Sequence, residues 1–137
     1  EMDTKQISES DLKVITKKKP TKAQIESMLF GWKVVKYVKS NAIVLTRGGK
    51  TVGIGMGQTS RVDSAQLAIR RADKLSRGAC LASDAFLPKA DTVTFAAKAG
   101  ITAIIQTGGS IADPEVIKEA DKRKIAMVVT GVRHFRH

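Results

Sequence analysis

The stretch ITAIIQ (residues 101–106) decides the fold class of this 137-residue chain. It is a continuous apolar run, which is typical of a parallel strand covered by helices on both faces. The pattern on either side alternates, with strands expected at residues 80–83 and 125–129 and helices expected at residues 91–99 and from Asp113. Strand, helix, strand, helix and strand in succession predict a parallel sheet with helices packed against it.

The first half of the chain predicts one helix and a hairpin. Thr21 stands at the start of a helical pattern, and Gln24 follows at the spacing of a capping box. The apolar face of that helix includes Trp32, which favours a core position over a stacking role. Strands are expected at residues 42–46 and 51–55, and the glycines between them favour a tight hairpin turn.

Composition and charge describe an ordinary globular domain with anionic partners. Apolar residues make up 42% and charged residues 27%, and the net charge is +11. Residues 1–10 are polar, residues 12–16 could form a strand and residues 17–20 are a basic linker, so we assign residues 1–20 to an N-terminal arm and linker, the truncated end of a longer chain, and residues 21–137 to the main subdomain. No run reaches the roughly 18 apolar residues of a membrane helix. No apolar signal region precedes the domain, so we expect a cytoplasmic protein that does not bind a membrane.

Two groups of residues could carry chemistry at the carboxyl ends of the strands, where ligands gather in such sheets. Residues 107–110, TGGS, precede a helix and suit either an anion site or a plain tight turn. Arg61 opens another helix, where the dipole disfavours a cation unless an anion compensates it; a surface arginine is the alternative. Metal-binding signatures are absent from the sequence, and the single cysteine, Cys80, lies in an apolar stretch that favours a buried thiol.

A glycine-rich segment precedes the helix that Arg61 opens. Gly53, Gly55 and Gly57 alternate, so the dinucleotide pattern GxGxxG is not met. Alternate glycines on a strand instead clear one face for something that lies close. The inner face of the following helix is expected to comprise Val62, Ala65, Ile69, Ala72 and Leu75.

Several ungapped motifs resemble the C-terminal part of the bifunctional purine-biosynthesis family. They are VKSNAIV, VGIGMGQTSRVDSAQLA, SDAFLP, AKAGITAIIQTGGSIAD and IAMVVTGVRHFRH. That family fuses an inosine-monophosphate cyclohydrolase domain to an aminoimidazole-carboxamide-ribonucleotide (AICAR) formyltransferase domain. The resemblance implies a three-layer α/β/α, cytidine-deaminase-like subdomain with a mixed, mostly parallel sheet. It also implies formyl transfer from 10-formyltetrahydrofolate to AICAR, without a metal, at an active site formed across a homodimer.

The resemblance also assigns roles to individual residues. The residues expected to bind AICAR are Asn41, Arg61, Phe86, Arg133 and His137, with Arg133 on the 5′-phosphate. Those expected to face the folate are Asp91, Gly109 and Ser110. A guanidinium fork suits phosphate oxygens, and the net positive charge is consistent with steering two anionic ligands towards the site.

The chain departs from the family pattern in ways that bear on activity. The family's catalytic Lys–His pair belongs to an earlier subdomain, and this chain has no Lys–His dipeptide, so we expect no catalytic residue here. Lys89 stands where an aromatic residue is common, and Thr107 where proline is common. We therefore expect an inactive fragment that binds substrate and needs the rest of the bifunctional chain.

Two other functions remain open from the sequence. The basic composition suits a nucleic-acid-binding module, although no nucleic-acid motif occurs and the resemblance implies that nucleic acid is not a partner. A non-catalytic scaffold domain that folds and dimerises is the other alternative.

Overall fold

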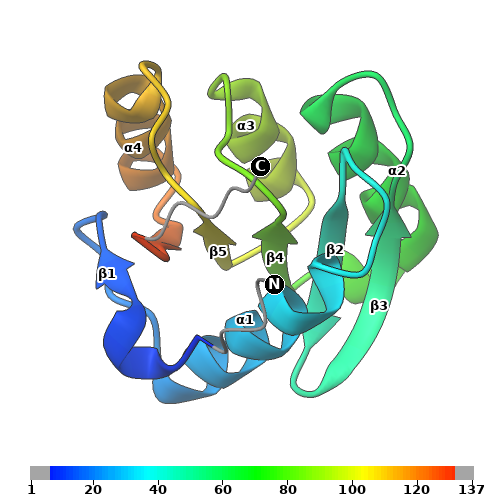
Figure 1. The fold of residues 1–137 in the computed structure, drawn as a ribbon, viewed down its shortest axis with the longest axis horizontal. Helices are drawn as coiled ribbons and strands as arrows, with labels where there is room; N and C mark the ends of the chain where they lie inside the picture. Colours follow the sequence, from blue (N-terminus) through cyan, green and yellow to red (C-terminus); the bar gives the residue numbers. More distant parts are fainter. Residues whose placement is uncertain (1–6, 132–137) are drawn as a thin grey trace, which may run out of the picture.

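A computed structural model describes residues 7–131 of the chain, and its centre is a single six-stranded sheet (Figure 1). The strand order is β1-β6-β5-β4-β2-β3. The strands are β1 (Lys13–Val14), β2 (Ile43–Arg47), β3 (Lys50–Gly55), β4 (Cys80–Ser83), β5 (Ala103–Gln106) and β6 (Ala126–Val129). The helices are α1 (Lys22–Val35), α2 (Arg61–Ala72), α3 (Asp91–Lys98) and α4 (Asp113–Lys122), with short 3-10 turns η1 (Glu9–Asp11) and η2 (Asp73–Ser76).

The sheet is mixed, as expected, but parallel pairing is confined to its centre. Strands β4, β5 and β6 run parallel, which confirms the prediction from the alternation around residues 101–106. The pairs β1–β6, β2–β3 and β2–β4 are antiparallel. Two of the five pairings are therefore parallel, and the expectation of a mostly parallel sheet is not confirmed. The tight β2–β3 hairpin accounts for one of the three antiparallel pairs, because a short turn can join only antiparallel strands.

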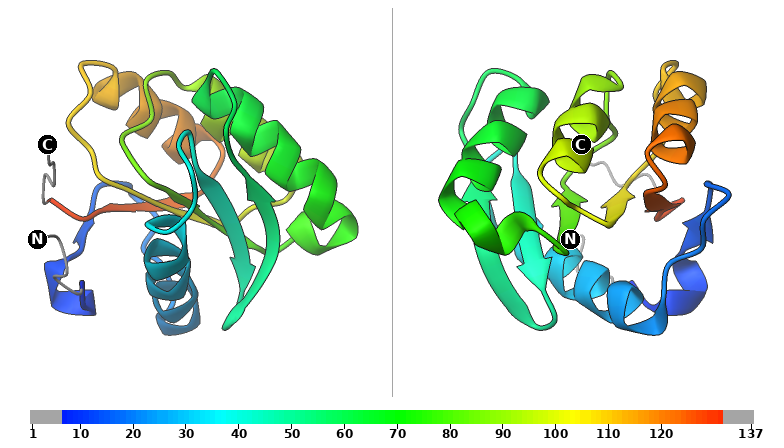
Figure 2. Two further views of the ribbon diagram at one scale, coloured as in Figure 1. Left: turned by 45° about the vertical axis from the view of Figure 1, so that its right-hand side comes forward. Right: turned by 180° about the vertical axis from the view of Figure 1, so that it is seen from behind.

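Helices cover both faces of the sheet and make three layers (Figure 2). Helix α1 lies alone on one face, where Met28, Trp32 and Val35 pack with alternate strand residues such as Val44. Helices α2, α3 and α4 cover the other face, where the strand residues of opposite orientation, such as Ile43, form a second apolar cluster. The period of two along each strand thus divides the core between the two faces.

The start and the core face of α1 agree with the sequence. The Thr21 hydroxyl accepts a hydrogen bond from the Gln24 backbone N–H at 3.1 Å, and the Gln24 side chain accepts one from the Thr21 N–H at 2.8 Å. This reciprocal pair is the predicted capping box. Trp32 is buried against the sheet, so its assignment to the core is confirmed.

The alternate glycines of β3 make room for helix α2 rather than for a nucleotide. A Cβ atom on Gly55 would lie 1.8 Å from the carbonyl oxygen of Ser64, and one on Gly53 would lie 2.2 Å from that of Ala68. The helix therefore presents small residues to the strand, and its buried positions are Ser64, Ala65, Ala68 and Ala72. The predicted inner face was partly wrong, because Leu75 lies beyond the end of α2 in η2 and is exposed.

Residues 7–20, which we assigned to an arm and linker, take part in the packing. Ile7 is buried in the cluster beneath α1, and β1 extends the sheet beside β6. The Lys17 backbone N–H donates to the Asp121 carboxylate at 2.8 Å, which ties the basic linker to α4. The division of the chain at residue 20 stays a prediction. No helix within residues 7–131 is long and apolar enough to span a bilayer.

Candidate functional site

The strand directions bring residues from distant parts of the sequence to one edge of the sheet. Strands β4, β5 and β6 end there, and so does β3, because it is antiparallel to β2 and β2 is antiparallel to β4. Strand β2 therefore begins at the same edge, which places Asn41 beside the segment after β3. We call this edge the carboxyl edge, and it is where ligands bind in related α/β sheets.

Arg61 and Asn41, two of the predicted AICAR-binding residues, are in contact at the carboxyl edge. One terminal nitrogen of the Arg61 guanidinium, Nη2, donates to the side-chain oxygen of Asn41 at 2.9 Å. Helix α2 also holds the backbone of Asn41, because the Ser64 hydroxyl donates to its carbonyl oxygen at 2.6 Å. The Asn41 amide nitrogen donates to the Gln58 carbonyl oxygen at 2.9 Å. The structure thus joins the loop before β2 to the start of α2.

Asp84 completes this group and was missed by the sequence analysis. Its carboxylate forms an ion pair with the other terminal nitrogen of Arg61 and accepts a hydrogen bond from the Ser40 hydroxyl. The Ala42 backbone N–H also donates to it, at 3.3 Å. Asp84 is the anion that the position of Arg61 at a helix start requires. Its place directly after β4, in the quoted motif SDAFLP, is the signal that could have identified it.

Phe86 lies in the segment that follows Asp84 and leads to α3. Its side chain is 41% exposed, so an aromatic face is accessible at the carboxyl edge. The next residue is fixed, because the Leu87 N–H donates to the buried Gln106 side chain at 3.1 Å. The segment is therefore anchored to β5 directly after Phe86.

The predicted folate-facing residues lie on the same edge of the sheet, beside the parallel strands. Asp91 is the first residue of α3. The backbone N–H groups of Gly109 and Ser110 donate to the Asp113 carboxylate, at 2.9 and 3.2 Å. These donors bind an internal carboxylate in this structure, so Asp113 closes the TGGS turn. No hydrogen bond within residues 7–131 joins these residues to Asn41 or Arg61.

The predicted phosphate-binding residue Arg133 and its neighbour His137 lie outside the described residues. The strand that precedes them, β6, ends at the carboxyl edge with Val129, and Gly131 is the last described residue. Their convergence with Arg61 stays a prediction.

Cys80 behaves as a buried apolar residue, as its surroundings in the sequence indicated. It lies in β4, facing α1, and burial raises the pKa of its thiol to about 11. A thiol of that pKa is a poor nucleophile at neutral pH. Within the described part of the chain, no group of three or more His, Cys, Asp or Glu residues is arranged to hold a metal ion.

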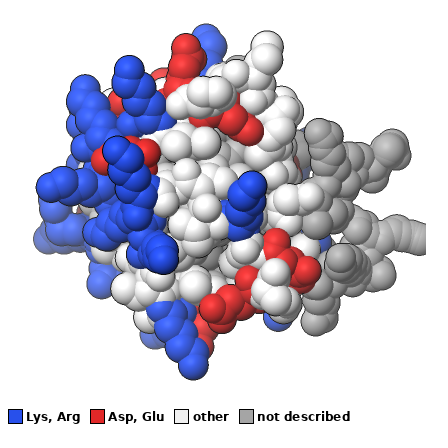
Figure 3. Space-filling model, turned by 90° about the vertical axis from the view of Figure 1, so that its left-hand side faces the viewer, with Lys and Arg blue, Asp and Glu red and all other residues white. Residues whose placement is uncertain are grey.

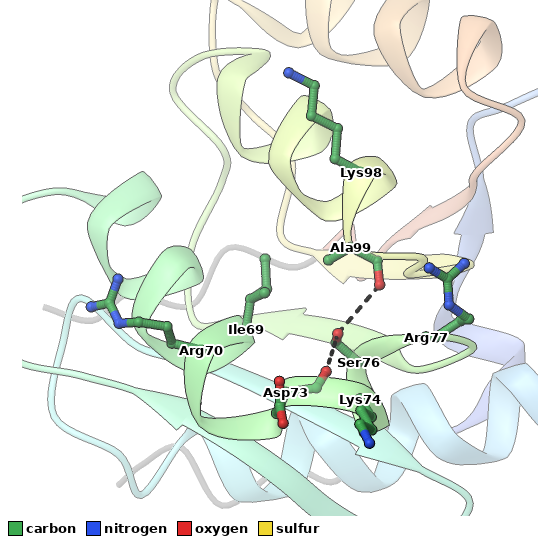
Figure 4. Close-up of a pocket in the computed structure, with 8 residues that line it drawn as sticks. All are labelled: Ile69, Arg70, Asp73, Lys74, Ser76, Arg77, Lys98 and Ala99. Atoms are coloured by element: carbon green, nitrogen blue, oxygen red, sulfur yellow. Dashed lines mark hydrogen bonds between the residues drawn. The ribbon is translucent and has the colours of Figure 1, made fainter.

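The opposite edge of the sheet is strongly basic and is separate from the candidate site. Figure 3 shows Lys and Arg side chains gathered along one side of the molecule. The topology places at this amino edge the cations of residues 17–19, 47–50 and 122–124. An open groove of about 660 Å³ lies between the end of α2 and the end of α3 (Figure 4). Its cations, Arg70, Lys74, Arg77 and Lys98, point away from one another, so they do not converge on one ligand.

This arrangement defines an α/β domain with a polar, arginine-centred cluster at the carboxyl edge of its sheet. A family model described as the AICARFT/IMPCHase bienzyme matches residues 1–71 of the chain. The chain belongs to this bienzyme family.

Three relatives described as bifunctional purine biosynthesis protein PurH illustrate the similarity. The chain is 56% identical to that of Halalkalibacterium halodurans over 137 residues, which are 100% of this chain and 27% of the relative. It is 58% identical to that of Staphylococcus carnosus over 98% of this chain and 27% of the relative. For Shouchella clausii the identity is 59%, over 94% of this chain and 25% of the relative. The chain thus spans about a quarter of the length of these relatives.

Solved structures of Acinetobacter baumannii RibD share the fold. Form 1 matches with a TM-score of 0.57 at 14% identity, over 79% of this chain and 35% of RibD. Form 2 matches with a TM-score of 0.53 at 12% identity, over 75% of this chain and 34% of RibD. Similarity at this level of identity concerns the α/β fold alone.

Proposed function

We propose that the chain is the C-terminal substrate-binding part of an AICAR formyltransferase and acts within a longer bifunctional protein. The observation that carries this proposal is the contact between Asn41 and Arg61 at the carboxyl edge, in a chain of the AICARFT/IMPCHase bienzyme family. The reaction moves a formyl group from 10-formyltetrahydrofolate to the amino group of AICAR, on the way to inosine monophosphate.

The proposed roles follow the chemistry of the side chains. Arg61 and Asn41 offer hydrogen bonds to the polar groups of AICAR, and the exposed ring of Phe86 offers a flat apolar face to its heterocycle. Arg133 would bind the 5′-phosphate with His137 nearby. Asp91, Gly109 and Ser110 are proposed to face the folate. At Gly109 and Ser110, the folate would lie against a turn whose backbone N–H groups already donate to Asp113.

In the proposed reaction, the amino nitrogen of AICAR attacks the formyl carbon. The bond between that carbon and the folate nitrogen then breaks, and the proton lost by the amino nitrogen ends on the folate nitrogen. The sequence lacks the Lys–His dipeptide that the family resemblance associates with proton transfer. This chain is therefore proposed to bind and orient AICAR, while the proton is moved by another part of the bifunctional protein.

The exposed apolar residues at the carboxyl edge support a partner at the site. Tyr37, Met56, Phe86 and Ile111 are all exposed, and each lies in a segment at this edge. They are four of the seven large apolar residues that are exposed within residues 7–131, and exposed apolar patches commonly mark interaction surfaces. We propose that the rest of the bifunctional chain, and the second subunit of a homodimer, cover this edge and complete the site.

The substitution Arg61→Ala in the full-length protein tests the proposal. A hydrogen bond from a charged group contributes about 1.5–3 kcal/mol, so the Michaelis constant for AICAR should rise by roughly 10- to 100-fold. Steady-state kinetics with AICAR and 10-formyltetrahydrofolate measure the change. The matched control is Arg70→Ala, an exposed arginine on the same helix that lies in the groove at the amino edge. Equal effects of the two substitutions would contradict the proposed site.

A further inference from the structure

We propose that Asp84 is a positioning residue that holds Asn41 and Arg61 together as one rigid AICAR-binding unit. This inference rests on the proposed function, and it concerns a residue to which the family resemblance gave no role. Asp84 connects three segments that are distant in sequence: the loop before β2, the end of β4 and the start of α2.

Both carboxylate oxygens of Asp84 are bound by donors of the protein. Oδ1 accepts from the Arg61 guanidinium and from the Ala42 N–H, and Oδ2 accepts from the Ser40 hydroxyl. The Asp84 backbone N–H also donates to the Ala42 carbonyl oxygen, at 3.2 Å. The carboxylate is therefore fixed on the residues that flank Asn41, and it cannot turn towards a ligand without breaking these bonds.

The orientation of Arg61 depends on this fixed carboxylate. Asp84 binds one terminal nitrogen of the guanidinium and Asn41 binds the other, so the plane of the group is defined by two partners. A guanidinium carries five N–H donors, and those not engaged here remain for a ligand. A planar group held in this way loses little rotational freedom when the ligand binds, which favours tight binding.

Burial and the helix dipole make the Asp84 charge necessary for this arrangement. The side chains of Arg61 and Asp84 are only 11% and 15% exposed. Arg61 is also the first residue of α2, where the positive end of the helix dipole opposes a cation. Without the carboxylate, the guanidinium would be stabilised by moving away from α2 and towards water, and its contact with Asn41 would be lost.

The chemistry argues for positioning rather than for direct contact with AICAR. AICAR carries a negatively charged phosphate, and an aspartate facing it would repel that group. Asp84 is instead neutralised by Arg61 and occupied by protein donors. Its removal should therefore weaken AICAR binding through Arg61, while the binding of the folate and the turnover step change little.

The substitution Asp84→Asn in the full-length protein tests this role. It keeps the size of the side chain and one acceptor oxygen, and it removes the charge that orients Arg61. The Michaelis constant for AICAR should rise about 5- to 20-fold, with less than a twofold change in kcat and in the Michaelis constant for 10-formyltetrahydrofolate. The matched control is Asp63→Asn, an exposed aspartate in the first turn of the same helix, which should change neither constant.

A double-mutant cycle separates positioning from a general loss of structure. In the Arg61→Ala background, Asp84→Asn should change the Michaelis constant for AICAR by less than a further twofold, because the guanidinium that Asp84 positions is absent. Ser40→Ala removes one anchor of the carboxylate and keeps its charge, so it should raise the same constant two- to fivefold even if Asp84→Asn unfolds. Thermal unfolding of each variant shows whether the fold is retained.

The outcomes distinguish this inference from the proposed function. An AICAR constant that rises in Arg61→Ala but is unchanged in folded Asp84→Asn or in Ser40→Ala would overturn the positioning role alone. The positioning role would also be overturned if the increases in the AICAR Michaelis constant caused by Asp84→Asn and by Arg61→Ala simply multiply in the double variant. An unchanged AICAR constant in Arg61→Ala would instead refute the proposed function.

Discussion

At the scale of single residues, Arg61 shows how far sequence reasoning reaches. Its position at a helix start left open a compensating anion or a plain surface arginine, and the structure provides an anion in Asp84. The sequence could not show which carboxylate this would be, because Asp84 is 23 residues away and follows strand β4. The contact between Arg61 and Asn41 depends on the same sheet order. Residues at strand ends could be nominated, whereas their pairing required the fold.

Cys80 gives a prediction at the same scale. Burial raises the pKa of its thiol to about 11, so at pH 8 about one molecule in a thousand carries the reactive thiolate. We expect the folded chain to react with iodoacetamide at least 100-fold more slowly than the chain unfolded in urea. Mass spectrometry of the alkylated protein measures both rates. Rapid labelling of the folded chain would show that Cys80 is accessible and would contradict its place under α1.

At the scale of secondary-structure elements, the contact between β3 and α2 determines the shape of the site. The glycines of β3 let the helix approach until its backbone oxygens touch the strand, and the Arg71 side chain donates to the Ile54 carbonyl oxygen at 3.0 Å. This close packing sets the position from which Arg61 reaches Asn41. The sequence predicted that something lies close to these glycines. Of the predicted inner face, Ala65 and Ala72 are buried and Ile69 packs against the core, but the small residues Ser64 and Ala68 that meet the strand were not included.

Gly55→Ala tests this contact. The added methyl group would lie 1.8 Å from the Ser64 carbonyl oxygen, so helix or strand must move. We expect a loss of at least about 3 kcal/mol in the free energy of unfolding, at the upper end of overpacking effects. Urea denaturation measures the loss. The control is Gly49→Ala in the β2–β3 turn, where a methyl group meets nothing within 4 Å, and a change of about 0.5 kcal/mol or less is expected.

Sequence periodicity predicted the elements better than it predicted how they pair. The strand at residues 80–83 has the expected bounds, and the strands around 101–106 and 125–129 differ by one or two residues at their starts. Alternation of strands and helices was sufficient for β4, β5 and β6. The antiparallel contact between β2 and β4 joins strands separated by β3 and α2, and no local pattern reports such a pairing.

At the scale of the whole molecule, the segment before residue 20 matters more than its polar sequence suggested. Ile7 is only 5% exposed and packs in the apolar cluster between α1 and the sheet, whereas Ile111 is 99% exposed. Strand β1 covers the open side of β6, which would otherwise be an unpaired edge. The two isoleucines are matched in chemistry and differ in burial.

We therefore predict different costs for the same substitution at these two positions. Ile7→Ala should lower the free energy of unfolding by about 2–3 kcal/mol, because a buried side chain is truncated. Ile111→Ala should change it by about 0.5 kcal/mol or less. Chemical denaturation of the 137-residue chain measures both values. If Ile7→Ala is as mild as Ile111→Ala, the N-terminal segment is an appendage and not part of the core.

The basic amino edge has a consequence for how an anion encounters the molecule. Strands of four residues are about 13 Å long, and the Debye length at physiological ionic strength is about 8 Å. An anion at the carboxyl edge is thus largely shielded from the cations around residues 17–19 and 122–124. The net charge of +11 therefore overstates the electrostatic attraction at the carboxyl edge, and a diffusing anion is attracted first to the basic amino edge. Capture of AICAR would then depend on the few cations beside the site and not on the net charge of the whole chain.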